Sequence, residues 1–512
     1  MDAIFDGLTR GVPGIAPRQM QPASATFERP SDIAAARSLR YDPAKLFLGV
    51  IGATIERSPT GERFAQGGVE IGVGDDRHAL LLAGSRSGKS RAAILPNLLR
   101  YAGSVLAIDP KGELALATAQ VRASKLGQRV AVVDPFDTTK RRLPKDRYGG
   151  FNPIASMGSL SADKDDETHR SSAVEDAVLI TDAMVIPGTG DPHWDESART
   201  IIEGVILEVA TARRFDGRRN LVTVRDLLAE GETGTDPESG ETLSGLEVLE
   251  GYMRASREPA VRRAAADFFE RPDRERDSVL STARRHLRAL ALPEIAASLS
   301  GDGFDLAGLK TSRMSVYLCL PGRHMGTCGR WLRLFINLAL QAMERTPGYP
   351  AAGCPVLFVL DEFASLGHMR QIEDAAGQIA SYGVKLWPIL QDLGQLKALY
   401  KERWETFMGN AGVLQFFGNN DLTTLEWISK RLGSTTIEQE SGSHVTTDAR
   451  AKGALGESWS ARTTAVMEPD EIALRFGRAD PLLRQLIIRA GYAPMILQRA
   501  YYDKHSAFAG GR

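Results

Sequence analysis

The sequence of 512 residues predicts an α/β fold with a mostly parallel sheet, interrupted by an all-helical segment. Three observations support this prediction. Short apolar runs alternate with helical patterns from Arg77 to Val133 and again after Lys310, as in parallel sheets covered on both faces. A glycine-rich loop joins the first of these runs to a helix. Between the two α/β stretches, nearly every periodic segment has helical spacing.

The first seventy residues form a mixed region in this prediction. Met1 to Arg40 contain several prolines and little periodicity, so we expect a loosely ordered arm there. Strand-like segments follow over 46–55 and 68–73. We expect these strands to precede the α/β region rather than to belong to its parallel part.

The α/β elements follow in order. In the first stretch we expect strands at 79–83, 104–108 and 130–133, and helices at 90–101 and 114–126. In the second we expect a strand at 314–320, an apolar helix at 331–343, and strands at 356–360, 384–390, 413–417 and 486–489. Gly231–Ser244 is polar and glycine-rich and predicts a loop. Ile437 to Thr464 is rich in Ser, Thr, Gly and Ala and predicts a flexible surface excursion.

These patterns divide the chain into five parts. Residues 1–70 are the arm and its strands, 71–158 and 313–435 are the two halves of a nucleotide-binding domain, 159–312 are an all-α insert domain, and 436–512 are the excursion followed by a strand that returns to the nucleotide-binding domain. A chain of this length exceeds one compact core and is expected to form two to four domains.

The composition is that of an ordinary globular protein. Hydrophobic residues make up 43% and charged residues 25%, and the formal net charge is −1, so no global basic field indicates a polyanion partner. The three cysteines form no metal-binding pair and predict reduced thiols in a cytoplasmic protein. We find neither a signal sequence nor a transmembrane segment, because the longest early apolar run, 46–53, is too short to cross a bilayer.

The loop Ala83–Ser90 predicts a phosphate-binding site. Small residues after a buried strand allow backbone N–H groups to turn inward onto phosphate oxygens, here from Gly84, Ser85, Arg86, Ser87 and Gly88. Lys89 is expected to reach the outer phosphates of ATP, and the Ser90 hydroxyl to bind Mg²⁺. The strict pattern begins with glycine, where this chain has Ala83. The alternative is an ordinary strand, turn and helix without a ligand.

Hydrolysis also requires a magnesium-organising acid and a group that polarises water. Asp361 and Glu362 follow a buried strand, and we expect Asp361 to bind the metal shell and Glu362 to polarise the water. Gln391 ends the next strand, at the same sheet edge, where an amide can sense the terminal phosphate or orient the water. Asp109 ends another strand and could line the site, compete as the metal site, or only form a turn. This layout is that of the additional-strand P-loop ATPases.

Basic residues gather in the helical segment, and acidic neighbours accompany them. We expect an ion-paired, solvated surface there rather than a phosphate track. The arginines are Arg213, Arg214, Arg218, Arg219, Arg274, Arg276, Arg284, Arg285 and Arg288.

Several segments together resemble the coupling proteins of type IV secretion, the conjugative TraG-like family. They are 75–78, 109–113, Phe151-Asn152-Pro153, His193-Trp194-Asp195-Glu196, 360–367, 386–393, Gly409-Asn410, 418–421 and 468–472. The resemblance implies a RecA-like ATPase domain with an all-helical insert, and assembly as a homo-hexamer. It also implies that Lys89 and Ser90 are the phosphate-loop pair, Asp361 and Glu362 the acid pair, and Gln391 the sensor.

The resemblance further implies partners. Such proteins receive a relaxase bound to single-stranded DNA and pass it to type IV secretion channel components at the inner membrane. This sequence departs from the family in lacking amino-terminal transmembrane helices, so we expect a cytoplasmic protein, peripheral at the inner membrane, with a separate membrane anchor protein as one explanation. It also lacks the arginine that some members place before the sensor strand, where 377–382 has none; Arg370 and Arg431 are the candidates for that trans-acting role.

Three functional hypotheses follow. The leading one is an ATP-hydrolysing, DNA-translocating coupling protein. The second is a nucleotide-gated receptor for secreted protein substrates, which the near-neutral net charge favours. The third is a double-stranded DNA pump of the FtsK/HerA type.

Overall fold

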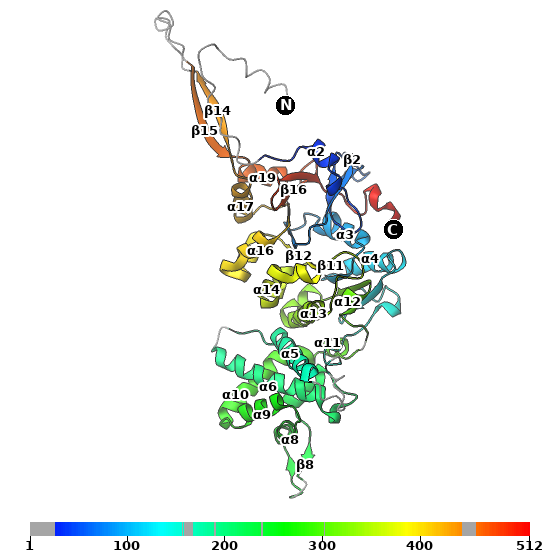
Figure 1. Ribbon diagram of the computed structural model, residues 1–512, viewed down its shortest axis with the longest axis vertical. Coiled ribbons are helices and arrows are strands. Elements are labelled where there is room, and N and C mark those ends of the chain that lie inside the picture. Colours follow the sequence, from blue (N-terminus) through cyan, green and yellow to red (C-terminus); the bar gives the residue numbers. More distant parts are fainter. Residues whose placement is uncertain are drawn as a thin grey trace, which may run out of the picture.

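The computed structural model describes residues 26–155, 157, 167–188, 191–236, 239–301, 303–442 and 457–511. Its central feature is an eleven-stranded sheet with the order β4-β1-β17-β16-β13-β5-β12-β11-β6-β10-β7. The molecule is elongated: the helical segment lies at one end, and the β14–β15 hairpin projects from the other (Figure 1).

Seven neighbouring strands of this sheet, within the described residues, form its parallel part. Each pairs in parallel with its neighbours from β13 across to β7. The predicted mostly parallel α/β sheet is therefore confirmed. The strands are β5 (Ala79–Ala83), β6 (Val105–Ile108), β7 (Arg129–Val133), β10 (Met314–Leu318), β11 (Val356–Leu360), β12 (Val384–Leu390) and β13 (Val413–Phe417).

The other part of the sheet is antiparallel. β16 (Arg484–Arg489) pairs with β13, and β17 (Met495–Gln498), β1 (Leu46–Ile51) and β4 (Val69–Val73) follow in turn. The strand expected over 46–55 divides at Gly52, whose φ is +72°, and continues as β2 (Thr54–Arg57) in a hairpin with β3 (Arg63–Gln66). Neither β3 nor β17 was predicted from the sequence.

The sheet is buried on both faces. In β5, Leu80 and Leu82 belong to one hydrophobic cluster, whereas Leu81 and Ala83 belong to the other. The second cluster includes the helices η2 (Ser90–Ile94), α3 (Leu95–Arg100) and α4 (Glu113–Ser124). Because alternate side chains of β5 enter the hydrophobic clusters on opposite faces of the sheet, the strand needs a continuous apolar run.

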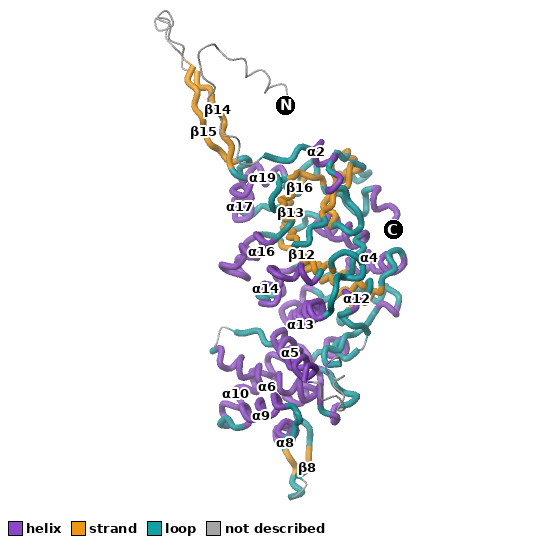
Figure 2. The backbone as a smooth tube through the Cα atoms, in the orientation of Figure 1, coloured by secondary structure: helices purple, strands orange, loops and turns teal. Residues whose placement is uncertain are grey.

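The segment between β7 and β10 is almost wholly helical, as predicted (Figure 2). The expected loop at 231–244 contains a short hairpin, which lies at the tip of this segment. No helix in the described ranges is long and apolar enough to cross a membrane. The elements are η3 (Lys145–Arg147), α5 (Glu167–Met184), α6 (Pro192–Thr211), η5 (Arg213–Phe215), α7 (Leu221–Ala229), β8 (Gly234–Thr235), β9 (Thr242–Leu243), α8 (Gly245–Arg254), α9 (Pro259–Phe269), α10 (Asp273–Leu287), η6 (Arg288–Ala291), α11 (Pro293–Ser298) and α12 (Gly308–Thr311).

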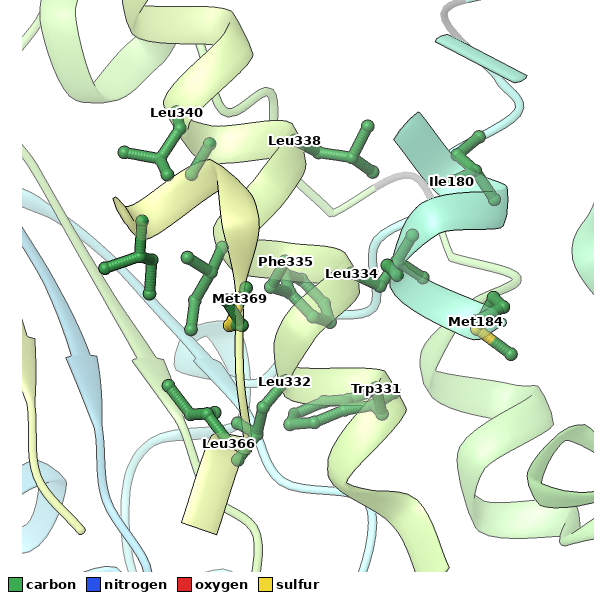
Figure 3. Close-up of a cluster of buried hydrophobic side chains, with 14 of the residues drawn as sticks. Ile180, Met184, Trp331, Leu332, Leu334, Phe335, Leu338, Leu340, Leu366 and Met369 are labelled. Carbon is green, nitrogen blue, oxygen red and sulfur yellow. The ribbon is translucent and has the colours of Figure 1, made fainter. Parts of the chain in front are cut away.

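Helix α13 (Met325–Arg345) joins the helical segment to the sheet. On one side of the helix, Leu334 points toward Ile180 and Met184 of α5. Neighbouring side chains of α13 pack with Leu366 and Met369 (Figure 3). Arg330 Nε also donates to the carbonyl oxygen of Met184, at 2.7 Å. A single hydrophobic cluster therefore runs from the sheet through α13 into the helical segment.

The other described helices lie between or after the strands of the second half of the chain. They are η7 (Gly322–His324), η8 (Phe363–Leu366), α14 (Arg370–Gln378), η9 (Ile379–Tyr382), α15 (Leu393–Tyr400), η10 (Lys401–Arg403), α16 (Trp404–Asn410), α17 (Leu422–Leu432), α19 (Pro469–Arg475) and η11 (Ser506–Gly511). In the expected amino-terminal arm, residues 1–25 lie outside the described part. From residue 30 the arm is folded as α2 (Pro30–Ala35) and η1 (Arg37–Leu39), which bury Ile33 and Leu39 against the sheet.

The expectation of a flexible excursion over 437–464 is corrected for its two ends. β14 (Ser434–Gly442) and β15 (Glu457–Ala465) pair antiparallel from Ser434 with Ala465 to Gly442 with Glu457. Each of the two strands contains a pair of Thr residues. Their β-branched side chains favour strands although the composition is polar. Residues 443–456 of the expected excursion lie outside the described residues.

Candidate nucleotide-binding site

The predicted phosphate-binding loop leaves the carboxyl end of β5 and leads into η2, a π-helical turn. Two of its positions require glycine for different reasons. Gly88 has a φ of +86°, in the left-handed region. A Cβ at Gly84 would lie 1.8 Å from the carbonyl oxygen of Gly418. Arg86, with a φ of +55°, adopts the left-handed region without being glycine, a backbone strain typical of functional loops.

The segment 418–421 forms one wall of this loop. Gly84 N–H donates to Phe417 O at 3.2 Å, and a Cβ at Gly418 would lie 2.4 Å from the Cβ of Ser87. Asn419 Nδ2 donates to Gln391 O at 3.0 Å, which ties the wall to the end of β12. The Gly-Asn-Asn-Asp segment, one of the segments that carry the family resemblance, therefore packs against the phosphate loop.

Lys89 and the acid pair meet at the end of β11. Lys89 Nζ lies 2.8 Å from Asp361 Oδ1 and 2.8 Å from Glu362 Oε1. Glu362 has a φ of +52° and a ψ of +42°, and its N–H donates to Asp361 Oδ1 at 3.0 Å. This left-handed turn directs both carboxylates to the same ammonium. The structure thus brings Lys89 together with an adjacent acid pair that lies about 270 residues further along the chain.

The charges of this cluster are coupled. Burial raises the pKa of Asp361, and the Lys89 ammonium opposes that rise. For Lys89, burial alone would lower the pKa, but the two carboxylates raise it above the ordinary value. Lys89 is therefore charged, and its charge is balanced within the chain.

Asp109 lies beside Asp361, because β6 and β11 pair in register up to Ala107 and Val359. It is 1% exposed, and its Oδ2 accepts from Ala115 N–H at 2.8 Å, at the start of α4. Burial raises the pKa of Asp109 to about 6, and the charge of Asp361 adds to this rise. Asp109 therefore both shapes a helix start and lines the acid cluster.

Gln391 and Ser90 lie at the rim of the same site. Gln391 follows Leu390, which pairs with Leu82 of β5, so it ends its strand beside the start of the phosphate loop. Its backbone is fixed by Gln395 and Asn419, whereas its side-chain amide makes no hydrogen bond to any described residue. Ser90 is the first residue of η2, next to Lys89.

A cavity of about 350 Å³, which was not predicted from the sequence, adjoins the loop. Its walls combine the loop with the β2–β3 hairpin and with the carboxyl-terminal tail. The lining residues are Arg57, Gly61, Glu62, Arg63, Arg86, Ser87, Gly88, Arg91, Arg478, Ala479, Asp480, Leu483 and Tyr501. Five arginines against two acids make this wall basic, which suits an anionic ligand.

The tail closes over the loop by direct contacts. Arg499 Nη1 donates to Ser87 O at 3.2 Å, and Tyr502 N–H donates to Arg91 O at 3.0 Å. Arg91 also pairs with Asp503 and lies 4.5 Å from the centre of the Tyr501 ring. Pairing across more than 400 positions has no local signal, so sequence patterns could not identify these residues.

The site fits Mg²⁺ bound together with a nucleotide. Mg²⁺ prefers hard oxygen ligands and commonly takes one or two from the protein and the rest from phosphates and water. Ser90, Asp361 and Asp109 offer such oxygens at this sheet edge. No cluster of three or more His, Cys, Asp or Glu side chains suited to a metal alone occurs in the described residues.

The other charged residues singled out from the sequence lie elsewhere. Five of the nine arginines of the helical segment form ion pairs, for example Arg218 with Glu232 and Arg219 with Asp216 at 2.6 Å, so the prediction of an ion-paired surface is confirmed for these. Arg370 is 85% exposed at the start of α14, and Arg431 lines a separate cavity of about 230 Å³. Among the described residues, neither arginine forms an ion pair or a side-chain hydrogen bond with the phosphate loop of its own chain.

The sheet, the glycine loop and the acid pair together give the α/β fold of the RecA-like P-loop ATPases. Within this class the chain belongs to the family of type IV secretory system conjugative DNA transfer proteins, whose family model matches residues 42–509. The resemblance inferred from the motifs is thus confirmed.

Curated relatives give the same result. The chain is 28% identical over 393 residues to the conjugal transfer protein TraG of Escherichia coli, covering 74% of this chain and 58% of that protein. It is 27% identical over 374 residues to the protein VirD4 of Agrobacterium fabrum, covering 72% of this chain and 52% of that one. The chain therefore spans little more than half the length of these relatives.

Solved structures share the fold. The plasmid coupling protein TrwB in complex with the ATP analogue ADPNP matches with a TM-score of 0.62 at 15% identity, covering 95% of this chain and 96% of that one. TrwB in complex with ADP and Mg²⁺ matches with a TM-score of 0.61 at 15% identity, with coverages of 96% and 97%. At this identity the likeness concerns the fold.

Proposed function

We propose that this chain is an ATP-hydrolysing coupling protein. It receives a relaxase bound to single-stranded DNA and drives or gates the transfer of this substrate into a type IV secretion channel during conjugation. The observation that carries the proposal is the contact of Lys89 with both Asp361 and Glu362, at 2.8 Å each, beside a strained glycine loop. Membership of the conjugative DNA transfer family supports the rest.

The residues have separate roles in this proposal. Backbone N–H groups of 84–90 hold the phosphates of ATP, and Lys89 exchanges its carboxylate partners for phosphate oxygens when ATP binds. This exchange releases Asp361 and Glu362 from Lys89, so that they can bind the metal and orient the water. Ser90 and Asp361 would hold Mg²⁺, with Asp109 nearby. The bound metal ion would neutralise charge on the transferred phosphoryl group.

The attacking water is the second half of the mechanism. In this proposal Glu362 orients the water and accepts its proton, which is supported by the contact of its carboxylate with Lys89 of the phosphate loop. Gln391 ends the adjacent strand, and its side-chain amide can orient the same water or contact the terminal phosphate. The basic cavity beside the loop would accept anionic phosphate groups of ATP.

The assembly and its location are also part of the proposal. We expect a homo-hexamer in which a neighbouring subunit completes each site, with Arg370 and Arg431 as candidates for the trans-acting cation. The partners are the relaxase–DNA complex and channel components at the inner membrane. In this proposal the protein is cytoplasmic and held at the membrane by these components or by a separate anchor protein.

ATP hydrolysis with and without DNA tests this function. The purified protein should release phosphate from ATP faster when single-stranded DNA is added, and Lys89→Ala should lower the rate on the order of 100-fold or more, because the phosphates lose their cation. Glu362→Gln should retain ATP binding and lose turnover. The control is Arg263→Ala, which removes one exposed positive charge on α9 and should leave the rate unchanged.

The same assay separates the alternatives. Turnover that rises only with duplex DNA would favour a double-stranded DNA pump. Absence of any DNA effect, together with ATP-dependent capture of nuclease-resistant protein partners, would favour a receptor for protein substrates. Hydrolysis that survives Lys89→Ala would contradict the proposed site itself.

A further inference from the structure

The segment after β7 is an unusually basic loop. Residues 137–147, here called the basic loop, carry five basic side chains and two acidic ones, a net charge of +3 in a chain of net charge −1. The basic residues are Lys140, Arg141, Arg142, Lys145 and Arg147, and the acidic ones are Asp137 and Asp146. None of the sequence motifs described above includes this loop.

The loop is held in a defined shape. Asp134, which is 4% exposed, accepts hydrogen bonds from Thr138 N–H and from the N–H and hydroxyl of Thr139, at 2.7–2.9 Å. The Tyr148 hydroxyl lies 2.8 Å from the Thr139 hydroxyl and closes the loop from its other end. Lys140 has a φ of +52°, and Asp137 and Arg141 share this left-handed region. Three strained residues so close together indicate a loop built for a purpose other than stability.

Most of the positive charge in the basic loop has no internal partner. Lys140, Arg142 and Lys145 are exposed, and their side chains form no ion pair or hydrogen bond within the described ranges. Arg141 lies 4.6 Å from the centre of the Tyr148 ring and 3.6 Å from Asp137, an ion pair at long range. The charge therefore remains available to a ligand, in contrast to the paired arginines of the helical segment.

Neighbouring turns add to this basic surface. Phe136 stacks on the His324 ring with centroids 3.9 Å apart, which brings Arg323 and η7 next to the loop. The turn that carries exposed Lys111 also contacts it, since a Cβ at Gly112 would lie 3.0 Å from Thr139 Cγ2. All three segments follow parallel strands, so the surface lies on the sheet edge that holds the nucleotide site.

The basic loop is also connected to the acid cluster. Gly112 leads directly into α4, whose Ala115 N–H donates to Asp109, and the charge of Asp361 acts on Asp109. A short chain of contacts thus runs from the acid pair through the 109–112 turn to Thr139. A ligand on the loop and a nucleotide at the site would share these contacts.

We propose that the basic loop, with Lys111 and Arg323, binds the phosphodiester backbone of nucleic acid. The proposal rests on the proposed function and names where in the chain the DNA is contacted. Unpaired Lys and Arg side chains on a rigid loop are the groups that contact phosphates without reading sequence. None of the large exposed hydrophobic side chains of the described residues lies in the loop, so the surface offers no apolar group for insertion into a lipid membrane.

The test is DNA binding by a variant that combines Lys140→Gln, Arg142→Gln and Lys145→Gln. Binding of a fluorescent single-stranded oligonucleotide should weaken at least about tenfold at ~0.1 M salt. The slope of log affinity against log salt should become shallower by about 2, because each phosphate contact adds about 0.7. ATP hydrolysis without DNA should stay unchanged, and its stimulation by DNA should need a correspondingly higher DNA concentration.

A matched control separates specific contact from net charge. Arg213→Gln, Arg274→Gln and Arg288→Gln remove the same charge from exposed arginines of the helical segment that have no side-chain partner in the described residues. This variant should bind DNA as the unaltered chain does. An equal loss in both variants would overturn the proposal, because binding would then follow net charge alone.

Other outcomes are also decisive. Unchanged DNA affinity in the loop variant, while the unaltered chain binds DNA, would refute the loop proposal and leave the proposed function standing. Failure of the unaltered chain to bind DNA would refute both. Loss of DNA-independent hydrolysis or of oligomers would assign the loop to the subunit interface instead, and a selective loss of binding to phosphatidylglycerol vesicles would assign it to a membrane surface.

Discussion

Two buried carboxylate clusters in this molecule differ in what their charges do for stability. In the helical segment, Asp195 accepts hydrogen bonds from His286 Nε2 at 2.8 Å, from Arg285 and from Gly188 N–H. Burial alone would raise the pKa of Asp195, but these partners lower it below the ordinary value. At the sheet edge, burial raises the pKa of both Asp109 and Asp361, so their ionised forms destabilise the fold.

This difference indicates which cluster is structural and which is functional. A carboxylate with a lowered pKa contributes stability, whereas neighbouring carboxylates with raised pKa values are retained at a cost, as in active sites. A raised pKa alone does not identify a site, since burial also raises the pKa of Glu208 on α6. At the sheet edge the strained loop and Lys89 accompany the raised values, and α6 has neither.

The largest expected effect is the loss of the Asp195 cluster. Asp195→Ala leaves the buried His286 ring and the Gly188 N–H without their acceptor, and we expect a loss of about 3 kcal/mol in the free energy of unfolding. Chemical denaturation followed by circular dichroism measures this. Asp191→Ala, which removes only the N-cap of the same helix, is the control and should cost about 1 kcal/mol. A similar small loss for both would mean that the hydrogen bonds of Asp195 stabilise the fold no more than a helix cap does.

The same cluster predicts a pH dependence. Burial lowers the pKa of His286 below its ordinary 6.5, so the unfolded chain binds a proton first as pH falls through that value. Stability should therefore decrease below about pH 6.5, and decrease again when Asp195, with its lowered pKa, is finally protonated. His286→Gln should flatten the first decrease, and an unchanged pH profile in this variant would contradict the assignment.

The strands most directly predicted from the sequence are those that frame the candidate site. β5, β11, β12 and β13 match their expected bounds, because two covered faces demand an uninterrupted apolar run. β14 and β15 were missed because their polar composition outweighed their β-branched residues. The antiparallel β17 was missed because it is short and gains its stability from β1 and β16.

Prediction from the sequence had the same limit at the candidate site. Its motif residues were predicted because each follows a strand, where sheet geometry places side chains at one edge. Arg499, Tyr501 and Asp503 were missed because a tail that folds over the loop leaves no periodic pattern. The direct pairing of Lys89 with both acids depends on the left-handed turn at Glu362, which the sequence did not indicate.

A smaller effect, of opposite sign, is expected at the sheet edge. Asp109→Asn removes a buried ionised group whose pKa is raised to about 6, so at neutral pH and without nucleotide the free energy of unfolding should increase by about 1–3 kcal/mol. This gain should be absent below about pH 3.8 and complete above about pH 6, because the unfolded carboxyl ionises first. Thermal unfolding measured at several pH values tests this, and ATP hydrolysis should fall if Asp109 lines the metal site.

The smallest expected effect concerns Ser87 in the phosphate loop. Its hydroxyl oxygen is buried and has no hydrogen-bond partner among the described residues, although its Cβ packs against Gly418. Ser87→Ala should leave the melting temperature unchanged or slightly higher, because it removes an unsatisfied polar group while preserving the packing. It should also weaken binding of a non-hydrolysable ATP analogue about fivefold, the effect of one lost hydrogen bond of about 1 kcal/mol. The control is Ser85→Ala at the exposed side of the loop. A lower melting temperature with unchanged ATP affinity would mean that the Ser87 hydroxyl stabilises the fold. The contrast between a functional sheet edge and a structural cluster in the helical segment would then not extend to this residue.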